Sequence, residues 1–112
     1  MTDAPAAPIY HLATLAEWAE AQERGSVAPA SLAADGFIHC STPSQLAATI
    51  GRHHAHASEL AVLHLDPITL GDALVWEESR PGEVYPHIYR EISVDEVVEV
   101  ALWRRSDEAT PS

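Results

Sequence analysis

The sequence contains no lysine, a single cysteine and no long apolar run, and each absence excludes a class of protein. All six basic residues among the 112 are arginine. Without lysine, the chain cannot form the Schiff base of pyridoxal-phosphate enzymes or supply the lysine of a P-loop. The one cysteine, Cys40, has no partner for an internal disulfide. No run approaches the roughly 18 apolar residues of a membrane span and no leader is recognisable, so we expect a cytoplasmic protein.

The charge balance is strongly acidic and limits the choice of partners. There are 17 acidic against 6 basic residues, a formal net charge of −11. A field of that sign repels phosphate backbones and anionic lipid surfaces, so we expect neither nucleic-acid nor membrane binding. We expect a small-molecule ligand instead, and composition makes no prediction of the oligomeric state.

The pattern along the chain predicts one α+β domain over residues 9–105, with a disordered end at 1–8 and a frayed tail at 106–112. Two main helices are expected. One begins at Leu15 after the capping box Thr14-Leu15-Ala16-Glu17 and ends at Gly25. The other begins at the cap Thr42-Pro43-Ser44-Gln45. About six short strands are expected in a split or strongly bent mixed sheet: Ile9–Ala13, 36–41, 60–65, 74–77, 84–91 and 97–103.

Three shorter features complete the expected layout. Residues 26–35 are expected to form a loop. Pro86 lacks a backbone N–H, so its strand is expected at a sheet edge or with a bulge. A capping box that begins at Ser93 predicts one further turn of helix.

Three of the seven histidines share an unusual setting, and they are the candidate catalytic residues. His11, His39 and His87 each lie in the middle of a predicted strand between apolar neighbours. Burying an unpaired imidazole costs a few kcal/mol. Each ring is therefore either a hydrogen-bonded core residue or part of a polar site, and for the three together we favour a shared cavity.

Further polar residues accompany these histidines and are the candidate ligand-binding residues. Ser41 and Thr42 stand at a helix start, where free N–H groups and the helix dipole favour an anion, although capping alone also explains Thr42. Tyr85 and Tyr89 flank His87 on the same strand face. One of Glu77 and Glu78 is expected to face inward, with Glu77 as the candidate, and its carboxylate is either a general base or a group that orients a ribose hydroxyl, unless the pair forms a solvated strand end.

We expect Cys40 and the four remaining histidines to have no role in catalysis or metal binding. Cys40 points away from His39 and Ser41 by strand alternation, so we expect it to pack with Ile38 instead of acting as a nucleophile. His64 is expected to be a packed core residue. His53, His54 and His56 form no complete metal motif, and we predict no metal site.

Four sequence blocks carry a resemblance to a known family. Tyr10–Thr14 (YHLAT), 36–41 (GFIHCS), 74–77 (LVWE) and 82–89 (GEVYPHIY) resemble the blocks of domain-of-unknown-function family 952, a small bacterial family, over residues 9–103. The sequence differs in carrying Arg90 where relatives have Gly and His53-His54 where they carry aromatics, which places that histidine cluster outside the expected site.

The family's fold has been proposed to be similar to the ADP-ribosyltransferases, which bind NAD in a cleft between two small sheets. The resemblance implies that His11 holds the ribose or the nicotinamide amide, and that His39, Ser41 and Thr42 shape the pocket and meet a phosphate. His87 or Glu77 takes the later polar position. The strand that carries His87 has no clear match to the late Glu, which argues against protein ADP-ribosylation.

Three functional hypotheses follow. The first is an NAD-utilising transferase or hydrolase, or another enzyme that acts on an ADP-ribose-like nucleotide, with NAD as substrate. The second is a zinc site of hydrolase type formed by the three strand histidines. The third is a non-enzymatic ligand-binding or regulatory module with a pH-sensitive histidine core.

Overall fold

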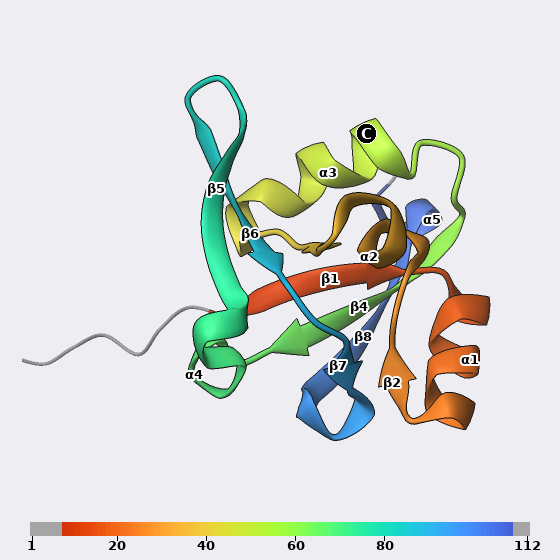
Figure 1. Ribbon diagram of the computed structural model, residues 1–112. Helices are drawn as coiled ribbons and strands as arrows, with labels where there is room; N and C mark the ends of the chain where they lie inside the picture. Colours follow the sequence, from red (N-terminus) through yellow and green to blue (C-terminus); the bar gives the residue numbers. More distant parts are fainter. Residues whose placement is uncertain (1–7, 109–112) are drawn as a thin grey trace, which may run out of the picture.

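The computed structural model describes residues 8–108, and it confirms the α+β class (Figure 1). Eight strands lie in this part of the chain: β1 (Ile9–Ala13), β2 (Ser26–Val27), β3 (Ile38–His39), β4 (Glu59–Leu65), β5 (Leu74–Arg80), β6 (Glu83–Ile88), β7 (Ile92–Ser93) and β8 (Val97–Arg104). The α-helices are α1 (Leu15–Arg24), α2 (Ala30–Asp35), α3 (Leu46–His53), α4 (Pro67–Leu70) and α5 (Arg105–Glu108), with 3₁₀ turns at Pro43–Gln45, Gly71–Ala73 and Val94–Glu96.

The strands form three small antiparallel sheets, in the orders β1-β4-β8, β2-β7 and β3-β6-β5. In the first sheet β4 lies in the middle, and its residues alternate between two core clusters. Leu63 packs with the larger cluster and Val62 with the smaller one. Burial on both faces explains why residues 60–65 read as a continuous apolar run.

The predicted helix boundaries are confirmed at both main helices. Thr14 and Glu17 form the reciprocal capping box of α1, and Gly25 ends that helix in the left-handed conformation. The Thr42-to-Gln45 cap opens a 3₁₀ turn that leads directly into α3. The predicted turn after Ser93 is the 3₁₀ turn Val94–Glu96.

The sheet β3-β6-β5 is attached to the first sheet by a short bridge. The Tyr10 N–H donates to the Ser41 carbonyl and the Ser41 N–H donates to the Tyr10 carbonyl, both at 2.8 Å. In Figure 1 the β5–β6 hairpin projects beside α3. The residues that follow β3 therefore lie between two sheets, which places them next to both β1 and β6.

Several predictions about the strands were wrong. The structure has eight strands instead of about six, and every pairing among the described residues is antiparallel, so the sheet is not mixed. Residues 26–35 are not a loop, because they contain β2 and α2. The predicted strand over 36–41 is reduced to the two residues of β3. Two-residue strands are too short to leave an alternating pattern, and α2 has no side-chain cap at Pro29.

The prediction that the strand with Pro86 lies at a sheet edge or carries a bulge there was also wrong. β6 is the middle strand of its sheet, and its pairing with β5 shifts register between Glu78 and Arg80, away from Pro86. The Pro86 carbonyl accepts from the Cys40 N–H at 3.1 Å. In an antiparallel strand the N and O of one residue point to the same side. The missing N–H therefore faces the end of the two-residue strand β3, where the ladder already stops.

No helix among residues 8–108 is long and apolar enough to cross a bilayer. Of the expected disordered ends, residues 1–7 and 109–112 lie outside the described part of the chain, whereas α5 extends over Arg105–Glu108.

The contrast between two glycines gives a first test of the fold. Gly25 has a φ of 90° and an added Cβ would meet no atom within 4 Å, so Gly25→Ala carries only the backbone cost. We expect a loss of about 1–2 kcal/mol in the free energy of unfolding, because an L-residue is strained in the left-handed region. Gly51 lies inside α3, also with open space. Gly51→Ala should therefore stabilise the protein, by about 0.5–1 kcal/mol.

Chemical denaturation of both variants checks this pair. Destabilisation by both would contradict the helical geometry assigned to Gly51.

Candidate functional site

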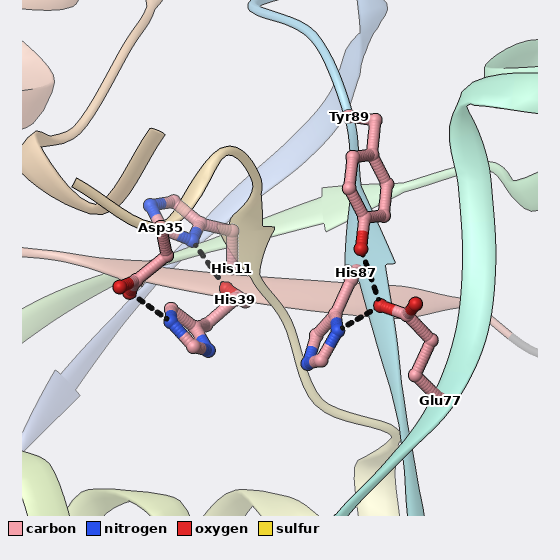
Figure 2. A network of polar contacts seen from close by, with 6 residues as sticks. All are labelled: His11, Asp35, His39, Glu77, His87 and Tyr89. Atoms are coloured by element: carbon pink, nitrogen blue, oxygen red, sulfur yellow. Dashed lines mark hydrogen bonds and ion pairs between the residues drawn. The ribbon is translucent and has the colours of Figure 1, made fainter. Parts of the chain in front are cut away.

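The pairing of β3 with β6 sets two of the three predicted histidines directly opposite each other. His39 and His87 are register partners, and their ring centroids lie 5.4 Å apart in an edge-to-face arrangement (Figure 2). His11 approaches from β1, but its Nδ1 lies 2.9 Å from the main-chain carbonyl oxygen of His39. His39 and His87 thus share a site through their rings, and His11 supports it through the backbone.

His87 is held firmly from two sides. Its side chain is 6% exposed, and its Nδ1 lies 2.7 Å from Glu77 Oε1. The Tyr89 hydroxyl donates to the same Glu77 oxygen at 2.7 Å. Phe37 stacks on the imidazole with 4.0 Å between ring centroids. These contacts fix both the position and the rotation of the ring.

The second nitrogen of His87, Nε2, has no partner. Among residues 8–106, whose side chains the structure describes, it is the one buried side-chain nitrogen or oxygen without a hydrogen bond. Because the Glu77 carboxylate only accepts, it holds a proton on Nδ1 of the neutral ring, and Nε2 then carries a lone pair. The same bond acts on Glu77: hydrogen bonds from His87 and then from Tyr89 lower the pKa of that carboxyl.

His39 repeats this arrangement at the rim of the site. Its Nε2 lies 3.0 Å from Asp35 Oδ2, and its side chain is 51% exposed. Figure 2 shows the other nitrogen of each ring on the side that faces the opposite ring, with the two carboxylates on the outer sides. Two imidazole–carboxylate pairs therefore face each other across a short gap.

The structure does not bring the three histidines into one cavity or a metal tripod. His11 is buried, and burial lowers its pKa although the bond to the His39 carbonyl acts in the opposite direction. In the described part of the chain, no three His, Cys, Asp or Glu side chains are placed to hold one metal ion. Neither of the two clefts that adjoin at His39 is lined by all three rings, and the tripod of the zinc hypothesis is not formed among the described residues, because Nδ1 of His11 is bonded to main chain.

Of the clefts that these histidines line, two adjoin each other at His39. The His87 cleft, between the β5–β6 hairpin and α3, has a volume of about 250 Å³. It is lined by His39, Cys40, Ser41, Thr49, Arg52, His53, Ser79, Arg80, Tyr85 and His87. The His11 cleft, between β1, α2 and α3, has a volume of about 410 Å³ and includes His11. Both clefts share the residues His39, Cys40, Ser41, Thr49 and His53.

The lining of the His87 cleft differs sharply in charge from the protein as a whole. It contains Arg52, Arg80 and three histidines and no acidic residue, although the chain has a net charge of −11. The His11 cleft, by contrast, contains Glu17 and Asp35. The His87 cleft is therefore the place where this acidic protein offers positive charge to a small anion.

Arg52 is the strongest anion-binding candidate in the His87 cleft. A terminal nitrogen of its guanidinium donates to the buried Tyr85 hydroxyl at 2.5 Å. Among residues 8–106, whose side chains the structure describes, no carboxylate forms an ion pair with it, whereas Arg80 Nε lies 3.4 Å from Glu83 Oε1. The Tyr85 hydroxyl, which itself donates to Glu83 Oε2 at 3.5 Å, thus orients Arg52 without a direct ion pair to a carboxylate.

The helix start offers less to an anion than expected. The Ser41 N–H is bonded to the Tyr10 carbonyl, and the Thr42 N–H donates to Gln45 Oε1 at 3.1 Å. The Ser41 hydroxyl lies 2.8 Å from the Thr49 hydroxyl. Ser41 lines both clefts and Thr42 lines neither, so Thr42 serves as a cap.

Sequence reasoning missed several residues of the site. Phe37, Asp35, Thr49 and Arg52 were not considered, and His53 was placed outside the site although it lines both clefts. One signal was present: Asp35 lies four residues before His39. The contacts of Arg52 and His53 depend on how α3 packs against the β5–β6 hairpin. Packing between segments distant in the chain leaves no local pattern in the sequence.

Cys40 and His64 were both expected to be structural residues. Cys40 is buried in the same core cluster as Ile38, as predicted. His64 is half-buried instead of fully packed, with its ring 4.5 Å from that of Tyr10 and its Nδ1 3.9 Å from Glu99.

Comparison with known proteins gives a family and a solved fold. A family model described as "Protein of unknown function (DUF952)" matches residues 12–100. The crystal structure of protein CC0527 from Caulobacter crescentus is 37% identical, with a TM-score of 0.79 over 84% of this chain and 83% of that one. The solution NMR structure of CC0527 is also 37% identical, with a TM-score of 0.74 over 84% and 82% of the chains. No curated protein matches.

The contacts of Glu77 give a titration prediction. His87→Phe should raise the pKa of Glu77 toward its ordinary value of 4.5, because the bond from the imidazole is the main cause of the lowered pKa. Tyr89→Phe should raise it less, because the phenol is the second cause. Carbon-13 NMR of the Glu77 carboxyl through the acid range checks both, and a larger rise in Tyr89→Phe would contradict this order.

The burial of Cys40 predicts an unreactive thiol. Burial raises its pKa far above the ordinary value of 9.0, so the native protein should react with a disulfide reagent only as it unfolds. Ala48→Cys, on the exposed side of α3, provides the matched control and should react at once with one equivalent. Fast labelling of Cys40 in the native wild-type protein would be inconsistent with its position in the core.

Proposed function

This chain belongs to the DUF952 family of proteins of unknown function, and from the geometry of the His87 cleft we propose that it binds a small phosphorylated nucleotide of the NAD or ADP-ribose kind. The observation that carries the proposal is the charge of the lining. Arg52, Arg80, His39, His53 and His87 gather in one cleft without an acidic residue among its lining side chains.

Electrostatics favours a ligand with a compact negative charge. Arginine pairs with phosphate through charge-assisted hydrogen bonds in a fixed fork geometry. At physiological ionic strength the acidic surface is screened beyond about 8 Å, so the cleft governs binding at close range. A long polyanion would still meet the acidic exterior, which disfavours nucleic acid and leaves a small phosphorylated molecule.

The shape of the site suits a nucleotide that has two parts. The His87 cleft and the His11 cleft adjoin at His39, Ser41, Thr49 and His53. A phosphate beside Arg52 would leave room for a ribose or a base to extend toward His11. The resemblance to ADP-ribosyltransferases, with a nucleotide between two small sheets, supports this arrangement as an analogy of fold.

On this proposal the nucleotide is a substrate, and the protein is an NAD- or ADP-ribose-utilising transferase or hydrolase. The opposed imidazoles of His39 and His87 provide groups that can accept or donate protons beside the bound phosphate. Glu77, Tyr85 and Tyr89 keep these groups and Arg52 in place.

Replacement of Arg52 tests the proposal directly. Arg52→Gln should weaken the binding of ADP-ribose about tenfold to a hundredfold, since a charge-assisted hydrogen bond contributes about 1.5–3 kcal/mol. Isothermal titration calorimetry measures the change. Arg104→Gln removes an equal charge from the exposed strand β8 and should leave the affinity nearly unchanged.

The wild-type protein supplies the decisive control for this experiment. Saturating NAD or ADP-ribose should raise its melting temperature and shift the NMR signals of His39, His53 and His87. If saturating NAD and ADP-ribose do neither, the proposed function is wrong.

A further inference from the structure

The gap between His39 and His87 is the one place in the site where the described residues leave a buried polar atom unsatisfied. His87 Nε2 is buried and has no partner, while its ring is fixed by Glu77 and Phe37. Leaving a buried polar group unbonded costs about 1–3 kcal/mol. A fixed ring whose buried nitrogen lacks a protein partner therefore indicates a position for a bound atom.

The two inner nitrogens are the candidate hydrogen-bond partners of a single oxygen atom. The ring centroids lie 5.4 Å apart, and no hydrogen bond joins the rings directly. An oxygen that bridges the two rings would lie at about 2.8 Å from each inner nitrogen. In the neutral rings the carboxylates of Asp35 and Glu77 hold the outer protons, so both inner nitrogens are acceptors. A water molecule, with two donors, matches that pair.

We propose that His39 and His87 hold a nucleophilic water and that the protein hydrolyses the phosphoanhydride bond of a nucleoside diphosphate derivative bound in the His87 cleft. This inference rests on the proposed nucleotide binding and adds the bond that breaks. His87 is the proton acceptor. Asp35, Glu77 and Tyr89 are positioning residues, because they act through the two imidazoles.

The charge of the cleft decides between two reactive centres of such a nucleotide. Attack at the ribose carbon passes through a transition state with positive charge on the sugar, which enzymes stabilise with carboxylates. The lining of the His87 cleft has no carboxylate. Attack at phosphorus develops negative charge on oxygen, which Arg52, Arg80 and His53 would stabilise. The same side chains that bind the phosphate therefore favour reaction at phosphorus.

The step balances without an oxidant or a further reactant. The water oxygen forms a bond to one phosphorus of the diphosphate as His87 Nε2 takes a proton from the water. The bond from that phosphorus to the bridging oxygen breaks, and its electron pair leaves with the other phosphate. Glu77 stabilises the imidazolium until its proton passes to solvent, and two phosphate monoesters are the products.

The experiment is incubation of the full chain with ADP-ribose, and separately with NAD, in water enriched in oxygen-18. Mass spectrometry should find AMP and ribose 5-phosphate from ADP-ribose, and AMP and nicotinamide mononucleotide from NAD. One oxygen-18 atom should enter one product phosphate. Release of nicotinamide with oxygen-18 on the ribose would assign the reaction to carbon and overturn the inference.

The two proposals fail in different ways. Nucleotide binding, seen as a raised melting temperature and shifted His87 signals, without labelled phosphate would overturn the hydrolysis and leave the binding proposal standing. Absence of nucleotide binding would overturn both.

Variants identify the proton acceptor and exclude a contaminating enzyme. His87→Gln should lower kcat about a hundredfold or more with little change in KM, as expected for the loss of a general base. His64→Gln, purified in the same way, removes a histidine of β4 outside both clefts and should leave kcat unchanged. Equal activity in His87→Gln and His64→Gln, at matched melting temperatures, would overturn the assignment.

Glu77→Gln separates positioning from packing. The Gln side chain has nearly the same volume as Glu but lacks the negative charge beside His87. The acidic limb of the pH–rate profile should therefore shift. A profile unchanged in position would show that Glu77 has no part in the proton transfer.

Discussion

The antiparallel register between β3 and β6 is the constraint on which the rest of the site depends. It consists of only two residue pairs, Ile38 with Ile88 and His39 with His87. The first pair is completely buried and anchors both strands in the core. The second pair is thereby held at the edge of that core, one ring buried and the other half exposed. Shifting the register by one residue would turn each histidine to the opposite face.

The bridge between Tyr10 and Ser41 extends this constraint to the first sheet. Because β1 is hydrogen-bonded to the segment after β3, Nδ1 of His11 lies within hydrogen-bond distance of the His39 carbonyl, and the His11 ring supports the backbone of the site. Helix α3 follows directly and brings Arg52 and His53 over the hairpin. A net charge of −11 is spread over the molecule, yet the elements joined at this point present only basic and neutral side chains to the His87 cleft.

Much of this fold was accessible from sequence because its signals are local. The capping boxes at Thr14 and Ser93 and the glycine at position 25 each determine a boundary through their own hydrogen bonds or backbone angles. The sequence predicted that histidines from separate strands share a site, but it did not predict that His39 and His87 are register partners. The direction of the His11 ring and the approach of Arg52 were not predicted either, since both depend on contacts between residues that are 28 and 33 positions apart.

The contrast between His11 and His87 shows what distinguishes a structural histidine from a reactive one in the same core. Both rings are buried and both use Nδ1 for a hydrogen bond. The partner of His11 is a neutral carbonyl, which does little to offset the cost of charging a buried ring, and the pKa of His11 is lowered. The partner of His87 is a carboxylate, which fixes the ring through a charge-assisted hydrogen bond. A buried imidazole with one unbonded nitrogen and a carboxylate on the other is suited to contact a reacting group, and of these two buried rings only His87 has both features.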